Sequence, residues 1–209
     1  INLMGVEVKH IAALSGHSGC LYAIDQGLSK HTVFTGGSDK FIALWNLKTM
    51  QAEKFAASLP SPIYAMCHIP EKQLLLAGTT TGSVLILDLE KKEEIKILQH
   101  HTAPIFDIKY SLKSNCFYTV SGDGNFAVGS LDALSLIQIK KLTNEKVRNI
   151  NFNDTTSEIA VALGDCKVVV FDLHTLDQKT AFMAHQSAVY VVRYSPDGSF
   201  LLTGGKDAH

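Results

Sequence analysis

The sequence has no excess of basic charge, and this absence bears directly on function. Its 209 residues include 19 Lys and Arg against 20 Asp and Glu, for a net charge of −1. Proteins that bind nucleic acids draw most of their affinity from basic side chains that contact phosphates. We therefore expect no nucleic-acid partner. The local run of Lys140, Lys141, Lys146 and Arg148 is interrupted by Glu145, and we interpret it as a solvated edge.

Long apolar runs and paired cysteines are absent as well. No stretch reaches the roughly twenty apolar residues that span a bilayer, and the start of the chain does not resemble a signal peptide. The four cysteines occur singly, without a C-x-x-C pair. We therefore expect no metal, no cofactor and no membrane contact, and we predict a soluble, cytoplasmic protein. The cysteines are Cys20, Cys67, Cys116 and Cys166.

The sequence does contain a repeat of 42 residues, which aligns without an insertion or a deletion. One column of the repeat holds the same residue four times: Leu47, Leu89, Leu131 and Leu173. Other columns hold apolar residues two positions apart, which is typical of a strand with one buried face. In the first row we expect four strands, at residues 21–25, 32–36, 41–46 and 51–57. Four short antiparallel strands repeated at this period predict the blades of an all-β propeller.

The motifs of the first row resemble a WD repeat. Gly16 and His17 are followed by a Thr-Gly-Gly-Ser-Asp turn that ends at Asp39, and then by Trp45 and Asn46, with Asn in place of the family's final Asp. The resemblance implies a buried, hydrogen-bonded tetrad in each blade, made of His, Ser or Thr, Asp and Trp. Rows two and four depart from this pattern, and we expect apolar packing there. The tetrad residues implied by the resemblance are His17, Thr35, Asp39 and Trp45 in row one, His101, Thr119 and Asp123 in row three, and His185, Thr203 and Asp207 in row five.

The count of repeats does not close a ring. Residues 6–14 occupy the column of an outermost strand and precede the first row, so we expect them to close a blade whose inner strands lie elsewhere. A ring of seven blades at this period needs roughly 290 to 300 residues. We therefore treat residues 1–209 as one incomplete propeller, with four whole blades and a fifth half-blade. The predicted repeats cover about 15–57, 58–99, 100–141, 142–183 and 184–209, the last of them truncated.

Residues that suggest catalysis have a simpler structural interpretation. A carboxylate recurs once in four of the five rows, at the same column: Asp39, Asp123, Asp165 and Asp207. Recurrence at the repeat period favours a structural role in each blade over one acid–base pair. We expect no catalytic residues.

One column has the composition of a binding surface. Five residues after the tetrad His column lie four aromatic residues and one arginine: Tyr22, Tyr64, Phe106, Arg148 and Tyr190. The residues before them have the alternation of a buried face, so this column should point the other way. Tyr and Arg are enriched at binding hot spots. The alternative is that the column packs between blades, although burying Arg148 there would be costly.

The resemblance places this column around the central mouth of the top face, with Lys146 and Lys206 at flanking positions. We therefore predict a non-enzymatic scaffold that binds a protein or peptide there. Two alternatives stay open: a propeller enzyme with its site at the same mouth, and a reader of methylated lysine through cation–π contacts. Against the enzyme, the rows have equal length and carry no inserted loop.

Overall fold

The computed structural model describes residues 7–208, which form four four-stranded antiparallel sheets and one two-stranded sheet. Blade 1 contains β1 (Leu21–Gln26), β2 (Thr32–Gly37), β3 (Phe41–Asn46) and β4 (Gln51–Ser58). Blade 2 contains β5 (Ile63–Ile69), the short 3-10 helix η1 (Pro70–Lys72), β6 (Leu74–Thr79), β7 (Ser83–Asp88) and β8 (Glu93–Gln99). Blade 3 contains β9 (Ile105–Ser111), β10 (Cys116–Ser121), β11 (Asn125–Ser130) and β12 (Ser135–Lys141). Blade 4 contains β13 (Val147–Asn153), β14 (Glu158–Leu163), β15 (Lys167–Asp172) and β16 (Gln178–Met183). Blade 5 contains β17 (Val189–Tyr194) and β18 (Leu201–Gly205).

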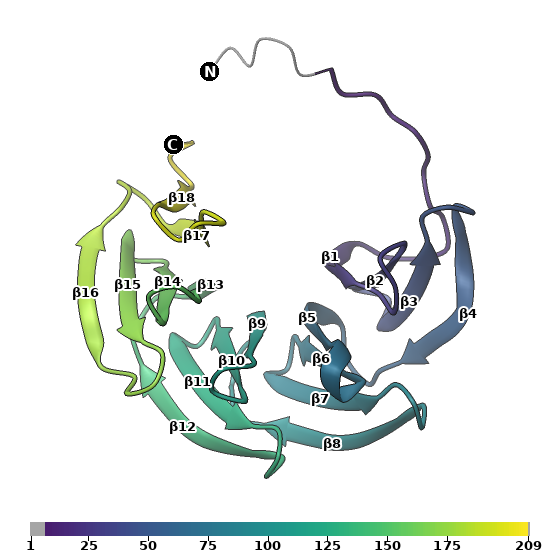
Figure 1. Ribbon diagram of the computed structural model, residues 1–209, viewed down its shortest axis with the longest axis horizontal. Helices are drawn as coiled ribbons and strands as arrows, with labels where there is room; N and C mark the ends of the chain where they lie inside the picture. Colours follow the sequence, from purple (N-terminus) through teal and green to yellow (C-terminus); the bar gives the residue numbers. More distant parts are fainter. Residues whose placement is uncertain (1–6, 209) are drawn as a thin grey trace.

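The sheets are arranged as a fan around a common centre (Figure 1). The first strand of each sheet, namely β1, β5, β9, β13 or β17, lies nearest the centre, and the fourth strand lies at the rim. Neighbouring inner strands contact one another in the order β1, β5, β9, β13, β17. The predicted all-β architecture of four-stranded antiparallel blades is confirmed, while a count of seven blades stays a prediction.

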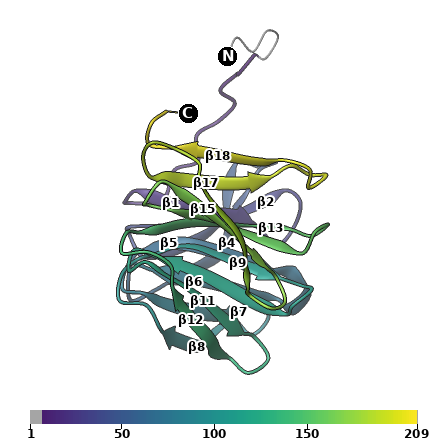
Figure 2. The ribbon, with the colours of Figure 1, turned by 90° about the vertical axis from the view of Figure 1, so that its left-hand side faces the viewer.

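The segment that precedes blade 1 differs from its expected form. We predicted an outer strand over residues 6–14; residue 6 lies outside the described residues, and residues 7–14 form no strand pairing within the described chain. Figure 2 shows this segment extending away from the sheets. A strand needs a hydrogen-bonded neighbour, so the closing role of this segment stays a prediction.

The turn that follows the second strand has one backbone feature in common in all five blades. One residue of each turn adopts a positive φ, and these residues are spaced by one repeat: Lys40, Gly82, Gly124, Cys166 and Ala208. Glycine adopts this conformation without strain, whereas the three other residues adopt it at a cost. The turn is therefore imposed by the pairing of the strands rather than by the local residue type.

Each blade buries its faces against its neighbours. Phe34 of blade 1 packs with Ile63 and Leu75 of blade 2, and similar apolar clusters join blades 2 and 3, blades 3 and 4, and blades 4 and 5. At the two ends of the fan the outward faces are uncovered within the described chain, where Ile24 is 72% exposed and Leu202 is 60% exposed. Burial of apolar surface between blades is therefore the main force that holds the fan together.

Polar side chains on the inner strands join neighbouring blades as well. The Asp107 carboxylate accepts a hydrogen bond from the Ile150 backbone N–H at 3.0 Å, and Asn149 accepts one from the Val192 N–H at 3.0 Å. Asp25 accepts a bond from the His68 N–H in the same way. In each pair the donor lies 43 residues after the acceptor, one repeat and one residue later. We call these bonds the inter-blade clamps.

The seam between blades 2 and 3 has the weakest clamp. Cys67 stands at the position of Asp25 in the repeat, and its sulfur faces the Tyr110 backbone N–H. Burial raises the pKa of the Cys67 thiol to about 12, so the sulfur stays protonated and is a weak acceptor. Besides the partly exposed ion pair between Lys72 and Asp132 at 3.2 Å, this seam relies on apolar contacts.

The clamps lead to a test of stability. Asp107→Ala should lower the free energy of unfolding by about 2 kcal/mol or more, because the buried Ile150 N–H and the half-buried Asn149 Nδ2–H lose their acceptor. Asp25→Ala is the matched control: it removes the same kind of bond from a more exposed carboxylate and should cost less. Urea unfolding measures both, and equal losses would contradict the role of burial in the Asp107 clamp.

Candidate partner-binding site

The predicted tetrad residues of row one lie within hydrogen-bonding distance of one another. The Trp45 indole N–H donates to Thr35 Oγ1 at 2.6 Å, and Thr35 Oγ1 lies 2.8 Å from His17 Nε2. His17 Nδ1 lies 2.7 Å from Asp39 Oδ2. An indole can only donate, so the Thr35 hydroxyl donates to Nε2, and His17 donates from Nδ1 to the carboxylate. The four side chains thus form one directed chain of hydrogen bonds.

The Asp39 carboxylate stays ionised in this network. Burial raises its pKa, but hydrogen bonds from His17 and from the backbone N–H groups of Phe41 and Ser18 outweigh that cost, and the pKa lies below its usual value.

In row five, His185 Nδ1 lies 2.8 Å from Asp207, and His185 Nε2 lies 2.9 Å from Thr203 Oγ1.

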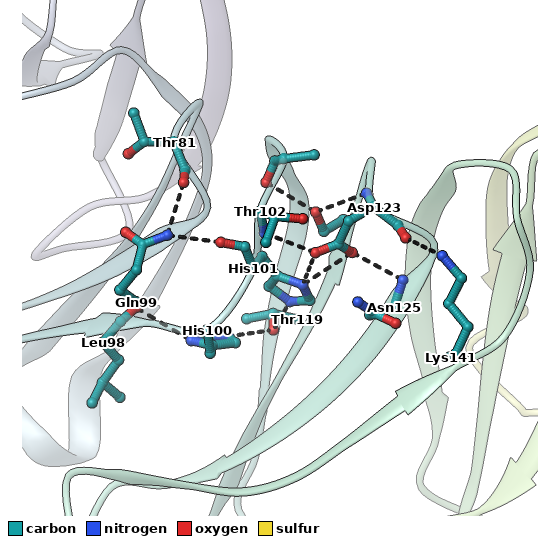
Figure 3. A network of polar contacts seen from close by, with 12 residues as sticks. Thr81, Leu98, Gln99, His100, His101, Thr102, Thr119, Asp123, Asn125 and Lys141 are labelled. Atoms are coloured by element: carbon teal, nitrogen blue, oxygen red, sulfur yellow. Dashed lines mark hydrogen bonds and ion pairs between the residues drawn. The ribbon is translucent and has the colours of Figure 1, made fainter.

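In row three, which has no tryptophan, two histidines contact the tetrad threonine (Figure 3). His101 Nδ1 lies 3.0 Å from Asp123 Oδ2, and His101 Nε2 lies 2.9 Å from Thr119 Oγ1. Gly129 occupies the Trp column, and the ring of Phe117 fills its space: a Cβ on Gly129 would meet Phe117 at 2.1 Å. His100 Nε2 lies 3.0 Å from Thr119 Oγ1, where the indole N–H would otherwise donate.

His100 is a residue that sequence reasoning missed. From the sequence we assigned only His101 to the row-three network, although Gly129 in the Trp column showed that the indole was missing. His100 Nδ1 also lies 3.2 Å from the Leu98 carbonyl, so only the doubly protonated ring could donate at both nitrogens. Burial, followed by the nearby His101, lowers the pKa of His100 to about 4, and the ring is neutral at pH 7.

Rows two and four lack the network, as their residues predicted. In row two, Leu59, Ala77 and Leu87 are buried at the tetrad columns. In row four, Thr143 donates to Asp165 Oδ2 at 3.1 Å, while Phe171 is buried at the Trp column.

The predicted binding column occupies a special backbone position. In the pairing of the first and second strands of each blade, one residue of the inner strand has no partner opposite it, which makes it the extra residue of a β-bulge. The five extra residues are Tyr22, Tyr64, Phe106, Arg148 and Tyr190. A bulge turns a side chain away from the regular alternation of its strand. The side chains of this column are therefore displaced from the two packed faces of each blade.

The structure brings the five side chains into one continuous row, which we call the inner row. The Tyr22 and Tyr64 rings lie 4.4 Å apart between centroids, and the Tyr64 and Phe106 rings lie 6.0 Å apart. The Arg148 guanidinium lies 4.9 Å from the Phe106 ring centroid and 5.2 Å from that of Tyr190. At the two ends of the row, Tyr22 is 47% exposed and Tyr190 is 45% exposed. The inner row joins five blades through side chains that are half-buried or exposed.

The two flanking lysines lie at the same edge of the sheets as the inner row. Lys146 immediately precedes β13, and Lys206 immediately follows β18, which pairs antiparallel with β17. Both lysines are exposed. This edge, where the inner strands begin, is called the top face below.

Other site chemistry is sparse. Among residues 7–208, no group of three or more His, Cys, Asp or Glu side chains is placed to hold a metal ion. A groove of about 290 Å³ runs between the outer strands of blades 1 and 2 and is lined by Phe55, Leu87 and Glu94, among others. It lies at the rim, away from the inner row. Within the described part of the chain, no helix is both long and apolar enough to cross a membrane.

Comparison with known families agrees with the tetrad geometry. The family model described as "WD domain, G-beta repeat" matches residues 8–46, which contain the complete His17–Thr35–Asp39–Trp45 network. The model described as "Eukaryotic translation initiation factor eIF2A" matches residues 79–207. The chain belongs to the WD40-repeat family.

The individual relatives share between 22% and 28% of their aligned residues with this chain. Mouse guanine nucleotide-binding protein subunit beta-like protein 1 is 28% identical over 139 residues, covering 65% of this chain and 42% of that protein. Mouse echinoderm microtubule-associated protein-like 1 is 26% identical over 199 residues, covering 94% of this chain and 24% of that protein. The 77 kDa echinoderm microtubule-associated protein of Strongylocentrotus purpuratus is 22% identical and is covered over 28% of its length. The chain thus spans only 24% to 42% of the length of these relatives.

Because the tetrad of row one is complete, we expect that removing its carboxylate lowers the free energy of unfolding substantially. Asp39→Ala should lower the free energy of unfolding by about 2 to 4 kcal/mol, because the His17, Ser18 and Phe41 donors lose their acceptor. Thr81→Ala, in the same column of row two, should cost much less, because that hydroxyl contacts only neighbouring hydroxyl groups. Urea unfolding of both variants checks the prediction, and equal losses would contradict a stabilising tetrad.

The histidines of row three predict that the stability of the fold depends on pH. The pKa of His100 is lowered from 6.5 to about 4 on folding, so the unfolded chain takes up the proton first as the pH falls. This contribution to stability is fully present above pH 6.5 and is lost between pH 6.5 and about 4, by up to about 3 kcal/mol. The pKa of His101 is lowered too and acts in the same direction.

The variant His100→Gln removes this titrating group, because an amide can still form a hydrogen bond with Thr119 but does not titrate in this range. Urea unfolding at pH 7.5 and at pH 4.5 should show a smaller loss for His100→Gln than for the unmodified chain. His10→Gln, an exposed position before blade 1, is the control and should leave the loss unchanged. An identical pH dependence in all three proteins would contradict the assignment.

Proposed function

We propose that this WD40-repeat chain is a non-enzymatic scaffold that holds a protein or peptide segment across the top face, in contact with the inner row. The observation that carries the proposal is the β-bulge repeated on all five inner strands. A bulge interrupts the ladder of hydrogen bonds, and such interruptions are common beside functional sites because they redirect a side chain. Five bulges that present aromatic or arginine side chains together favour a shared surface.

The chemistry of the inner row suits protein recognition. Tyr and Phe provide large contact areas with few rotatable bonds, so ordering them on binding costs little entropy. Arg148 adds a charge and a fork of N–H donors. The rigid strands that carry the row are held by the apolar packing between blades, so the surface is organised before a partner arrives.

The names of the relatives fit a role in assembly. They describe a subunit-like protein and microtubule-associated proteins, and none of these names refers to an enzyme. We infer a protein partner for this chain on the same grounds, in a soluble compartment such as the cytoplasm. Capture of methylated lysine is less favoured, because the Arg148 cation already occupies the faces of Phe106 and Tyr190 and would repel a second cation.

A comparison of two alanine variants tests this function. Tyr64→Ala should weaken partner binding by about 1 to 3 kcal/mol, since Tyr64 lies between Tyr22 and Phe106 in the row and contacts both. Lys91→Ala, in the exposed turn between β7 and β8 at the rim, is the control and should leave binding unchanged. Affinity purification with quantitative mass spectrometry measures which bound proteins are lost, and differential scanning calorimetry verifies folding. A partner retained by Tyr64→Ala and lost by Lys91→Ala would overturn the proposal.

A further inference from the structure

Among residues 7–208, the guanidinium of Arg148 has no anionic partner and is held by aromatic rings instead. Its carbon lies over the rings of Phe106 and Tyr190, which are contributed by the blades on either side. Its Nε is buried and has no hydrogen-bond acceptor among the described residues. Cation–π contacts hold the guanidinium by its faces and leave the N–H groups at its edge free to donate. Because the Nε–H is buried, an acceptor supplied from outside would meet the terminal Nη groups of the guanidinium.

The charged groups around Arg148 favour an anionic acceptor. Lys146 is two residues away, Lys206 lies at the same edge of blade 5, and Lys167 begins β15 at the same edge of blade 4. All three lysines are exposed. A partner carboxylate here would meet several cations and one preorganised fork of N–H donors.

The acidic side chains of the top face are largely engaged within the chain. Asp123 and Asp207 lie against His101 and His185 and accept hydrogen bonds from the backbone N–H groups of Thr102 and Gln186. Asp165 accepts from Thr143 and lies 3.7 Å from the Lys167 ammonium. Glu145 is the exposed exception beside Lys146. The charge left for a partner at blades 4 and 5 is therefore positive.

We propose that the segment bound at the inner row is acidic, with an Asp, Glu or terminal carboxylate that accepts two parallel hydrogen bonds from Arg148. This inference rests on the proposed function and adds the chemical class of the partner. Arg is suited to this role because its planar fork matches the two oxygens of a carboxylate. A nucleic acid is disfavoured: the net charge is −1, and Arg148 covers the two aromatic faces on which a base would stack.

Selection from a library of short random peptides displayed on phage tests the proposal directly. Peptides that bind the immobilised chain should be enriched in Asp and Glu, and this enrichment should disappear when the chain carries Arg148→Gln. Lys91→Gln, at the rim, is the matched control and should enrich the same acidic peptides as the unmodified chain. Thermal melting of each protein shows whether it is folded.

Affinities of one selected peptide then resolve the chemistry. Replacing its Asp and Glu by Asn and Gln should weaken binding at least about tenfold, and Arg148→Lys should restore only part of the affinity lost in Arg148→Gln, because a point charge lacks the fork. Binding should also weaken as the salt concentration rises. A single-stranded RNA oligonucleotide should not compete with the peptide.

Other outcomes would distinguish a failure of the acidic preference from a failure of the proposed scaffold function. Selection of neutral or basic peptides whose binding is lost in Tyr64→Ala would overturn the acidic preference and leave the scaffold function standing. Equal affinity for the acidic peptide and its amide version, or displacement of the peptide by RNA, would also overturn the acidic preference. Failure to enrich any peptide that depends on the inner row would overturn both.

Discussion

A sheet in this fold has two apolar faces, and neither face can be buried without a neighbouring sheet. Four apolar clusters meet this demand, one at each contact between successive blades. The rest of the structure follows from the resulting stack. Blades that must face one another repeat similar strand lengths and a common turn after the second strand, including a positive φ at Lys40, where the residue type does not favour it.

The same packing determines where the chain can offer a binding surface. Residues of the inner strands that alternate regularly are committed to the seams, as Ile63 and Ile105 are. On an inner strand, a side chain leaves the two packed faces where the alternation is interrupted, and the bulge provides that interruption once in each blade. The inner row is therefore a product of the repeat. Each inner strand has one extra residue at the same position of the repeat, and these residues form a continuous surface when the blades stack.

Much of this organisation could be predicted from the sequence, because the repeat makes each row a test of the others. The strands expected at 21–25, 32–36, 41–46 and 51–57 match β1 to β4 within one residue at each end. The contact of His100 with Thr119, at the place of the missing indole, could not be predicted, since it depends on a neighbour in space. The bulges and the inter-blade clamps also escaped prediction: alternation alone does not reveal an unpaired residue, and Asp107 looks like any strand carboxylate until Ile150 is seen beside it.

The unequal clamps give the fan an uneven stiffness. Between blades 3 and 4 a carboxylate bond resists sliding, whereas between blades 2 and 3 the corresponding position holds the Cys67 thiol. Apolar contacts are not directional, so they oppose separation of two sheets more strongly than they oppose a small slide. A load applied across the fan would therefore concentrate its shear at this seam. Tyr64 and Phe106 face each other across it, so the inner row would register such a slip as a change in their spacing.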